Sequence, residues 1–316
     1  MEFRASRIPY ENRNRARLWP GNARMAVLVY TAVEQWEWGT DEPLKAQGTY
    51  ASVRGVAPTL STRSAVDYGF HVGLPRLREI YREFDMKVTL WTNANAIQRF
   101  PSVVGGLAED GHEIGAHAYS EGATMGALAP AEREESVRRS ISTIESFTGK
   151  RPRGWVGPGA EATPDLIELL AKLDFEYHGD LQDDELPYFL HVGDSTMVEI
   201  PYRMAGNVND LPVLIRNPRP VRDAIDYLTQ AFDAYYAAAA THPLIFNFGT
   251  HPYVSGRPEG ARIFRAVLEH IHSHSDVWVT NYGEVATWWR EQFSDLVPDG
   301  GGDILASIPR MPTISA

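Results

Sequence analysis

The chain has 316 residues, of which 43% are hydrophobic and 22% charged, an ordinary composition for a globular protein with a substantial core. Its formal net charge of −11 argues against a nucleic acid or an anionic membrane as partner, and the absence of cysteine excludes disulfides, thiolate metal sites and cysteine nucleophiles. No apolar signal segment opens the sequence, and no run approaches the roughly 18 apolar residues of a membrane span, so we expect a cytoplasmic protein.

Short apolar runs alternate with amphipathic segments along most of the chain. The predicted strands are residues 25–31, 86–91, 112–117, 154–157, 175–180, 196–201, 244–251 and 277–280. The predicted helices are residues 73–84, 94–108 with an interruption at Pro101, 130–147, 163–173, 221–240, 257–274 and 282–293. Residues 34–66 form a long connection, a length typical of functional loops. This alternation predicts an α/β fold, an irregular (β/α) TIM-like barrel, rather than an open doubly wound sheet.

Both ends of the chain differ in composition from the barrel. Residues 1–24 form a basic N-terminal arm, with six arginines and one glutamate after Phe3. We expect this arm to pack on an acidic surface of the protein rather than to bind phosphate. Residues 25–293 form the predicted barrel. Residues 294–316, rich in glycine, form a tail or a subunit-contact arm.

Polar residues follow several of the predicted strands. In a parallel barrel the carboxyl ends of the strands meet at one rim, so these residues would share one site. They are Glu34, Asn93, Asn95, His117, Glu121, the turn 157–159, Asp180, Asp183, Asp184 and His251. The alternative for His117 and Glu121 is a strand cap followed by a solvated loop charge.

One histidine and two carboxylates within this set suit a divalent cation. Glu34, His117 and Glu121 could hold the cation and leave room for water and substrate. His251 could act as general acid toward a leaving nitrogen, because imidazole titrates near working pH. The HxHxH run from His270 to His274 ends a predicted helix. We expect its spacing to scatter ligands around that helix, and favour an interaction with the helix dipole instead.

Seven segments occur in a recognisable order. They are MAVLVYTAVEQWEWG, VDYGFHVGLPRLREIYREFDMKVTLW, GHEIGAHAYSE, TGKRPRGWVGPGAEATPD, FEYHGDLQDDELPYFL, FNFGTHPYVSGRP and VWVTNYGEVATWW. In this order the chain resembles the polysaccharide deacetylase family (carbohydrate esterase family four, the NodB-homology fold). Within that family it is similar to the cytoplasmic branch that holds the purine-catabolic allantoinase and a peptidoglycan-deacetylase-like protein. The resemblance covers roughly residues 25–293. It implies a barrel that hydrolyses carbon–nitrogen bonds in amides with a metal-bound water.

This chain departs from the family pattern at several positions. Where the family has two aspartates, a general base and then a metal ligand, the chain has Ala32 and Glu34. The family's His-x-x-x-His motif is here His117 to Glu121, and the Arg that orients the base is replaced by Val156. Losing the base and its Arg together is coherent, because the Arg alone would be an unpaired charge. The allantoinase branch also has a Glu matching Glu34 and is regarded as not needing a metal.

We therefore expect a hydrolase of non-peptide carbon–nitrogen bonds that acts on a small soluble amide or N-acetyl substrate. Glu34 and His251 are the expected catalytic residues, and Glu34, His117 and Glu121 the expected ligands of one zinc-like divalent cation, if a metal binds at all. The expected substrate-binding residues are Trp155, Asp180, Asp184 and Tyr188.

Two other functions stay open. The first is a metal-independent, allantoinase-like hydrolase of cyclic amides or ureides. The second is a catalytically retired barrel that binds a ligand or serves as a scaffold, for which the Ala32 position is the main argument. Oligomers are common in this branch, so we also expect a homo-oligomer.

Overall fold

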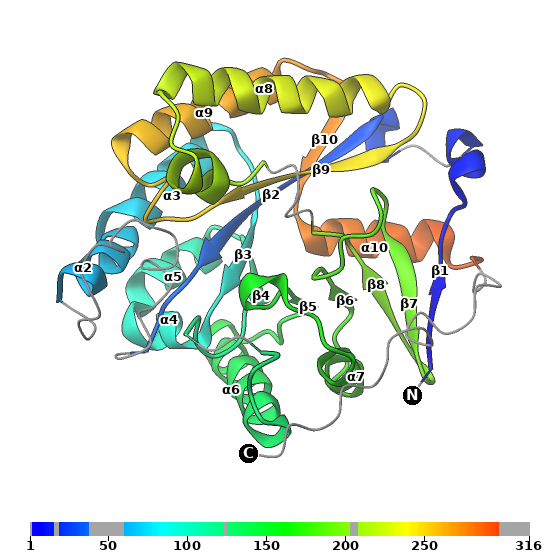
Figure 1. The fold of residues 1–316 in the computed structure, drawn as a ribbon, viewed down its shortest axis with the longest axis horizontal. Helices are drawn as coiled ribbons and strands as arrows, with labels where there is room; N and C mark the ends of the chain where they lie inside the picture. Colours follow the sequence, from blue (N-terminus) through cyan, green and yellow to red (C-terminus); the bar gives the residue numbers. More distant parts are fainter. Residues whose placement is uncertain (1, 16–18, 38–59, 123–124, 203–207, 297–316) are drawn as a thin grey trace.

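The centre of the molecule is a mostly parallel sheet built from the apolar runs (Figure 1). The structure, a computed structural model, describes residues 2–15, 19–37, 60–122, 125–202 and 208–296. The strands that pair in parallel are β2 (Met25–Val33), β3 (Thr89–Thr92), β4 (Glu113–Ala116), β5 (Gly154–Trp155), β6 (Tyr177–His178), β8 (Ser195–Glu199), β9 (Leu244–Thr250) and β10 (Val277–Thr280). Along the sheet the order is β8-β6-β5-β4-β3-β2, with β10 and β9 also paired to β2.

Strand β2 organises the sheet because it pairs with three other strands. Along one edge it pairs with β9, and along the other its first half pairs with β10 and its second half with β3. The free edge of β9 then meets the far end of the sheet. Ile245 donates its backbone N–H to the carbonyl of Glu185 (3.0 Å), and Gly249 donates to Val208 (2.9 Å). These bonds bring the sheet round into an irregular barrel, and the predicted fold class is confirmed.

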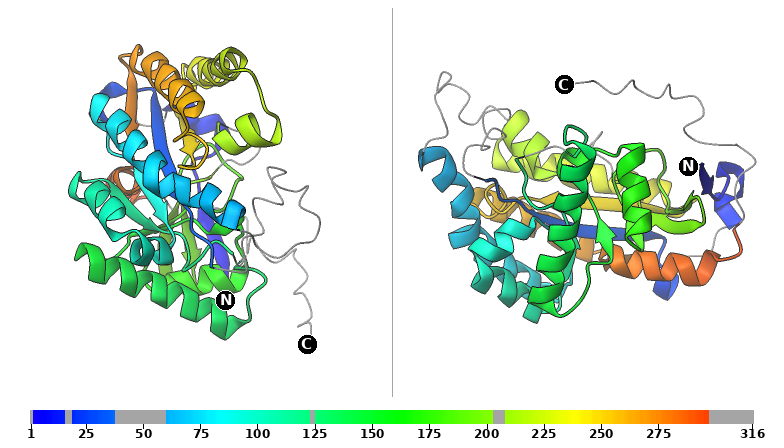
Figure 2. Two further views of the ribbon diagram at one scale, coloured as in Figure 1. Left: turned by 90° about the vertical axis from the view of Figure 1, so that its left-hand side faces the viewer. Right: turned by 90° about the horizontal axis from the view of Figure 1, so that it is seen from below.

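Helices cover the outside of the sheet, as Figures 1 and 2 show. They are α2 (Leu60–Tyr68), α3 (Leu74–Glu83), α4 (Ala94–Arg99), α5 (Pro101–Glu109), α6 (Pro130–Thr148), α7 (Pro164–Lys172), α8 (Val221–Ala238), α9 (Pro258–His272) and α10 (Tyr282–Phe293), with π-helical turns η3 (Gly69–Gly73) and η5 (Leu211–Arg216). Pro101 separates α4 from α5 because its ring cannot continue the first helix. Gly149 ends α6 with a φ of 71°, a backbone conformation that favours glycine. Within the described residues, no helix is long and apolar enough to cross a membrane.

The alternation of side chains along β2 divides the core into two faces. Val27 and Val29 pack toward the outer helices, whereas Leu28 and Tyr30 belong to a second cluster inside the barrel. Gly249 on the neighbouring strand leaves room for the tyrosine, since a Cβ there would lie 2.0 Å from the Tyr30 hydroxyl. The interior is therefore filled by side chains, and its aromatic residues reach the carboxyl ends of the strands.

The N-terminal arm joins the sheet. Strand β1 (Phe3–Ser6) pairs antiparallel with β7 (Tyr188–Val192), which in turn pairs antiparallel with β8. Arg7 contacts Asp183 (2.6 Å) and Asp184 (3.2 Å), and Arg13 contacts Asp184 (2.7 Å). The expected packing of the arm on an acidic surface is confirmed. Neither antiparallel strand was predicted, because each is short and β1 finds its partner far along the chain.

Other differences concern the connections. The predicted loop 34–66 contains the first turns of α2, and its residues 38–59 lie outside the described part of the chain. The predicted strands 154–157 and 175–180 shrink to the two-residue strands β5 and β6. The predicted tail lies beyond the described residues from 297 onward. The division of the chain into arm, barrel and tail stays a prediction.

Candidate active site

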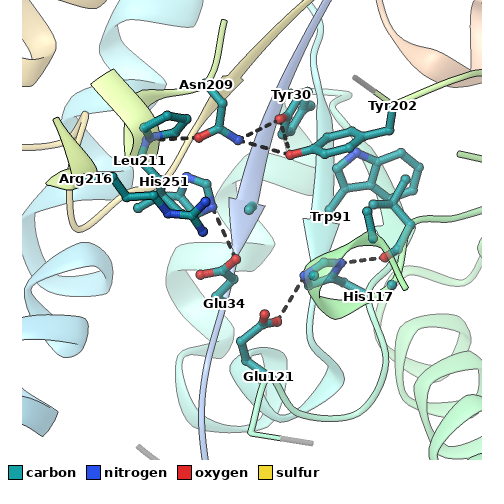
Figure 3. A pocket seen from close by; sticks show the side chains of 16 residues that line it. Tyr30, Glu34, Trp91, His117, Glu121, Tyr202, Asn209, Leu211, Arg216 and His251 are labelled. Carbon is teal, nitrogen blue, oxygen red and sulfur yellow. Dashed lines mark hydrogen bonds and ion pairs between the residues drawn. The ribbon is translucent and has the colours of Figure 1, made fainter. Parts of the chain in front are cut away.

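A small cavity lies at the carboxyl ends of the strands (Figure 3). Glu34, His117 and His251 directly follow the last residues of β2, β4 and β9, so the parallel strands deliver all three to one rim. The cavity volume is about 120 Å³. Its lining residues are Tyr30, Ala32, Glu34, Trp91, His117, Glu121, Val156, Gly157, Gly159, Ala160, Tyr202, Asn209, Leu211, Pro212, Arg216 and His251.

His251 lies between two buried carboxylates. Its Nδ1 is 2.6 Å from Asp210 Oδ1, and its Nε2 is 3.2 Å from Glu34 Oε1. Asp210 also accepts hydrogen bonds from the His251 backbone N–H (2.7 Å) and from Ser255 Oγ (2.7 Å). The Tyr253 hydroxyl donates to Glu34 Oε2 (2.8 Å). The imidazole ring is thus fixed at both nitrogens.

These contacts favour the protonated imidazole. Burial by itself would lower the pKa of His251, but Glu34 and Asp210 together raise that pKa to about 10. Burial would likewise raise the pKa of Glu34, yet the charge of His251 holds it below its ordinary value. Near neutral pH the structure therefore holds an imidazolium that can donate a proton into the cavity.

His117 and Glu121 face each other on the other side of the cavity. His117 Nδ1 lies 2.5 Å from the carbonyl oxygen of Val156, which can only accept, so Nδ1 carries the hydrogen. Nε2 then points toward Glu121 Oε2 at 3.0 Å. Burial and the nearby charge of Glu34 raise the pKa of Glu121 to about 7, although His117 opposes this. The pKa of His117 is raised to about 9 despite its burial, mainly by Glu121.

The loop that carries these two residues is held by backbone carbonyls and two asparagines. Glu121 donates its backbone N–H to the carbonyl of Gln35 (3.1 Å), and Asn95 Nδ2 donates to the same carbonyl (3.0 Å). Asn93 accepts from the Gln35 N–H (2.9 Å) and donates to the carbonyl of His117. The asparagines predicted at the end of β3 therefore position the loop and do not line the cavity.

The predicted ligand set is brought together. One donor atom from each of Glu34, His117 and Glu121 lies within 4.8 Å of the others. A histidine whose Nδ1–H binds a carbonyl and whose Nε2 faces a carboxylate pair has the arrangement of a metal ligand. Nε2 of His117 and Oε2 of Glu121 are buried and have no hydrogen-bond partner in suitable geometry. This donor set fits one divalent cation.

Ala32 and Val156 are the positions at which the resemblance predicts the family's base and its arginine, and this correspondence stays a prediction. Both line the cavity, and both are buried. Glu121, which also lines the cavity, is a carboxylate with its pKa raised to about 7.

Two of the predicted substrate-binding residues belong to the arm contact instead. Asp184 is bound by Arg7 and Arg13, and neither Asp184 nor Tyr188 lines the cavity. The Tyr188 ring stacks under the Arg7 guanidinium at 3.7 Å, and its hydroxyl donates to Asp183. The structure places these two residues in contact with the N-terminal arm, and their role in substrate binding stays a prediction.

The other two predicted residues support the cavity from behind. Trp155 is fully buried and packs edge-on against Phe175. Asp180 accepts the Gly157 N–H with both carboxylate oxygens (2.9 and 3.1 Å) and lies 3.2 Å from His178. Neither residue lines the cavity, and a contact of either one with substrate stays a prediction. Asp180 fixes the turn next to the Val156 carbonyl that receives His117.

The sequence reasoning missed several residues around the cavity. Asn209 Nδ2 donates to the hydroxyls of Tyr30 and Tyr202, at 3.0 Å each, and Arg216 brings a positive charge to the wall. Asp210, which hydrogen-bonds to the ring and the backbone N–H of His251, directly precedes η5. An acidic residue just before a proline-containing turn is a helix-start signal. That signal places the turn but does not say which histidine the carboxylate binds.

Comparisons with known proteins give a consistent result. The polysaccharide deacetylase family model matches residues 64–178. A peptidoglycan deacetylase from Helicobacter pylori is 29% identical over 248 residues, which cover 68% of this chain and 83% of that protein. The crystal structure of a probable polysaccharide deacetylase from Pseudomonas aeruginosa has a TM-score of 0.77 at 26% identity and covers 87% of this chain and 94% of its own. The crystal structure of the allantoinase Puue has a TM-score of 0.77 at 26% identity, with coverages of 91% and 95%.

Proposed function

We propose that the chain hydrolyses a non-peptide carbon–nitrogen bond in a small amide or N-acetyl compound, a proposal supported by the match of residues 64–178 to the polysaccharide deacetylase family model. The observation that carries this proposal is the position of His251. The histidine faces the cavity between Glu34 and Asp210, opposite a second carboxylate, Glu121. A proton donor and a proton acceptor on opposite sides of one small cavity are what the hydrolysis of an amide requires.

The roles follow from the two sides of the cavity. A water molecule beside Glu121 attacks the carbonyl carbon, and Glu121 accepts the proton of that water as the carbon–oxygen bond forms. The carbon–nitrogen bond then breaks, and the leaving nitrogen takes the proton that His251 Nε2 shares with Glu34. Asp210 keeps the imidazole oriented through Nδ1. The proposal therefore assigns to Glu121 the work that an aspartate at position 32 would do in the family.

Glu34, His117 and Glu121 would hold a divalent cation. Such a cation supplies Lewis-acid polarisation of the carbonyl and a lower pKa for its water. In this case Glu121 would offer the cation one carboxylate oxygen and keep the other for the water proton, and His117 would keep the orientation set by the Val156 carbonyl. Two carboxylates and one imidazole would bind the metal less selectively than a set with two histidines.

The size of the cavity bears on the substrate. About 120 Å³ is smaller than the roughly 300–1,000 Å³ of sites for drug-sized ligands. The cavity therefore suits a compact amide, or the amide end of a longer molecule. Tyr30 donates its O–H to Tyr202, so the Tyr202 hydroxyl and the guanidinium of Arg216 are the groups that offer donors to such a substrate.

The test is an assay of purified protein against N-acetylated sugars and simple amides, with metal content measured on the same sample. His251→Asn should lower kcat roughly 10²–10⁴-fold, the usual contribution of general acid–base catalysis. His242→Asn, at a histidine that does not line the cavity, is the matched control. Activity that is equal in both variants would refute the assignment.

A second function is favoured by the structural likeness to the allantoinase. In this version the enzyme opens a cyclic amide or ureide without metal, and Glu121 acts as base. The same assay, run on ureides and cyclic imides with and without chelator, separates the two. Turnover of ureides that survives chelation supports the metal-free version. Turnover of N-acetyl compounds that chelator abolishes supports the first.

The third possibility raised by the sequence is a barrel that has lost catalytic activity and binds a ligand or serves as a scaffold. It predicts no turnover of any amide and unchanged ligand binding in His251→Asn. The expected cytoplasmic location and homo-oligomer stay predictions.

A further inference from the structure

The HxHxH run, His270 to His274, lies at the end of α9. Its side chains were expected to point in different directions around the helix, but two of them come together. His270 lies in the last turn of α9 and His274 two residues beyond its end, yet their ring centroids lie 5.1 Å apart, and Asp233 of α8 approaches both. His272 points elsewhere and packs against Phe84, with ring centroids 5.2 Å apart. The run therefore does not scatter all its ligands, because two of its three histidines converge with a carboxylate from another helix.

The three side chains are close enough to share one ion. His270 Nε2 lies 2.7 Å from Asp233 Oδ1, and one donor atom of each residue lies within 4.8 Å of the others. The aspartate is exposed and both histidines are half-buried, so an ion has access from solvent. Helices α8 and α9 lie side by side, which places the cluster across their junction (Figure 1).

The histidine tautomer favours metal binding. His274 Nδ1 lies 2.9 Å from the carbonyl oxygen of His270, which can only accept, so Nδ1 carries the hydrogen. In the neutral imidazole, Nε2 then keeps its lone pair for a metal. A ring nitrogen fixed by a backbone carbonyl is the usual support of a histidine ligand.

Aromatic rings hold these imidazoles in place. Phe232 packs edge-on against both His270 and His274, and Tyr236 packs on His274 with centroids 4.4 Å apart. The Tyr236 hydroxyl is itself fixed by a hydrogen bond to Asp276 (2.6 Å). Ligands that are already oriented lose less side-chain entropy when they bind.

We propose that Asp233, His270 and His274 form a second metal site, separate from the cavity, that binds a divalent transition ion such as Zn²⁺, Ni²⁺ or Cu²⁺. Two imidazoles and one carboxylate suit these ions, and the exposed side leaves positions for water. The ion would join α8 to α9. Because the unfolded chain lacks the preformed site, binding would stabilise the folded state.

The experiment measures Zn²⁺ binding by titration calorimetry on full-length protein stripped of metal. All samples carry Glu121→Gln, which removes one ligand of the cluster in the cavity. Adding His274→Ala or Asp233→Asn should weaken Zn²⁺ binding by at least about 10–100-fold. His272→Ala, on the same helix but outside the cluster, should retain the affinity.

Two further measurements guard against variants that fail to fold. Zn²⁺ should raise the melting temperature of the Glu121→Gln protein and leave that of the Glu121→Gln/His274→Ala protein unchanged. Electron paramagnetic resonance of bound Cu²⁺ should show two nitrogen ligands, reduced to one by His274→Ala. The proposal is overturned if Asp233→Asn and His274→Ala both leave Zn²⁺ affinity and stoichiometry unchanged, or if the Glu121→Gln protein binds no Zn²⁺.

Discussion

Asp210→Asn provides a direct test of the proposed proton donor, because it changes the partner of His251 without touching the cavity lining. The pKa of His251 is about 10, against an ordinary value of 6.5, because the negative charges of Glu34 and Asp210 both raise it. Removing one of the two charges should lower this pKa by roughly 1–2 units, within the range of a single close charge. Each unit corresponds to about 1.4 kcal/mol of interaction with the imidazolium.

The expected result is a change in catalysis rather than in binding. Proton donation requires the protonated imidazole, so activity of the wild-type protein should fall as pH rises through about 10. In Asp210→Asn this alkaline limit should move down by roughly 1–2 units. The value of kcat should fall roughly 10²-fold because the ring also loses its anchor at Nδ1. KM should change little, since Asp210 does not line the cavity.

The assay is a pH profile of kcat and KM, recorded on the best substrate from the panel. Asp183→Asn is the matched control, because Asp183 binds Arg7 on the surface and lies outside the cavity. Thermal unfolding of both variants checks that they are folded. The reasoning is refuted if the alkaline limit of Asp210→Asn stays in place and its kcat matches that of Asp183→Asn.

Further predictions concern the base and the buried ion pairs. Glu121→Gln should reduce activity roughly 10²-fold or more and lower the metal content of the purified protein, and an active variant with unchanged metal would contradict both roles. The pKa of His178 is raised to about 10 in the folded protein. The protonated ring therefore stabilises the fold fully below a pH of about 6.5, and this contribution is lost as pH rises through about 10. Urea unfolding should show a lower free energy of unfolding at pH 10 than at pH 6.5, and equal values would refute this prediction. Arg13→Ala removes a partner of the nearly buried Asp184 and should cost roughly 1–3 kcal/mol of unfolding free energy. The same change at Arg4, in an exposed pair, should cost at most about 1 kcal/mol, and similar losses in both variants would contradict the burial argument.

The local pattern of the sequence was enough to place most of the barrel. Apolar runs and amphipathic periodicity depend on neighbouring residues, so the main strands and helices could be predicted to within a few residues. Glu34, His117 and His251 each come directly after a strand, and the carboxyl ends of parallel strands meet. The meeting of these residues at one cavity could therefore be inferred before any contact was known.

The contacts that tune the site depended on tertiary structure. Asp210 hydrogen-bonds to His251, which lies 41 residues away in the sequence. Arg7 of the N-terminal arm pairs with Asp184 and packs on Tyr188 across still longer sequence separations. Asp233 reaches His270 from a different helix. No periodicity or spacing encodes such pairs, because each forms only when separate elements pack together. The sequence by itself determined the barrel and the rim on which its polar residues gather. The packing of distant segments decided which carboxylate each histidine meets, and so its protonation state.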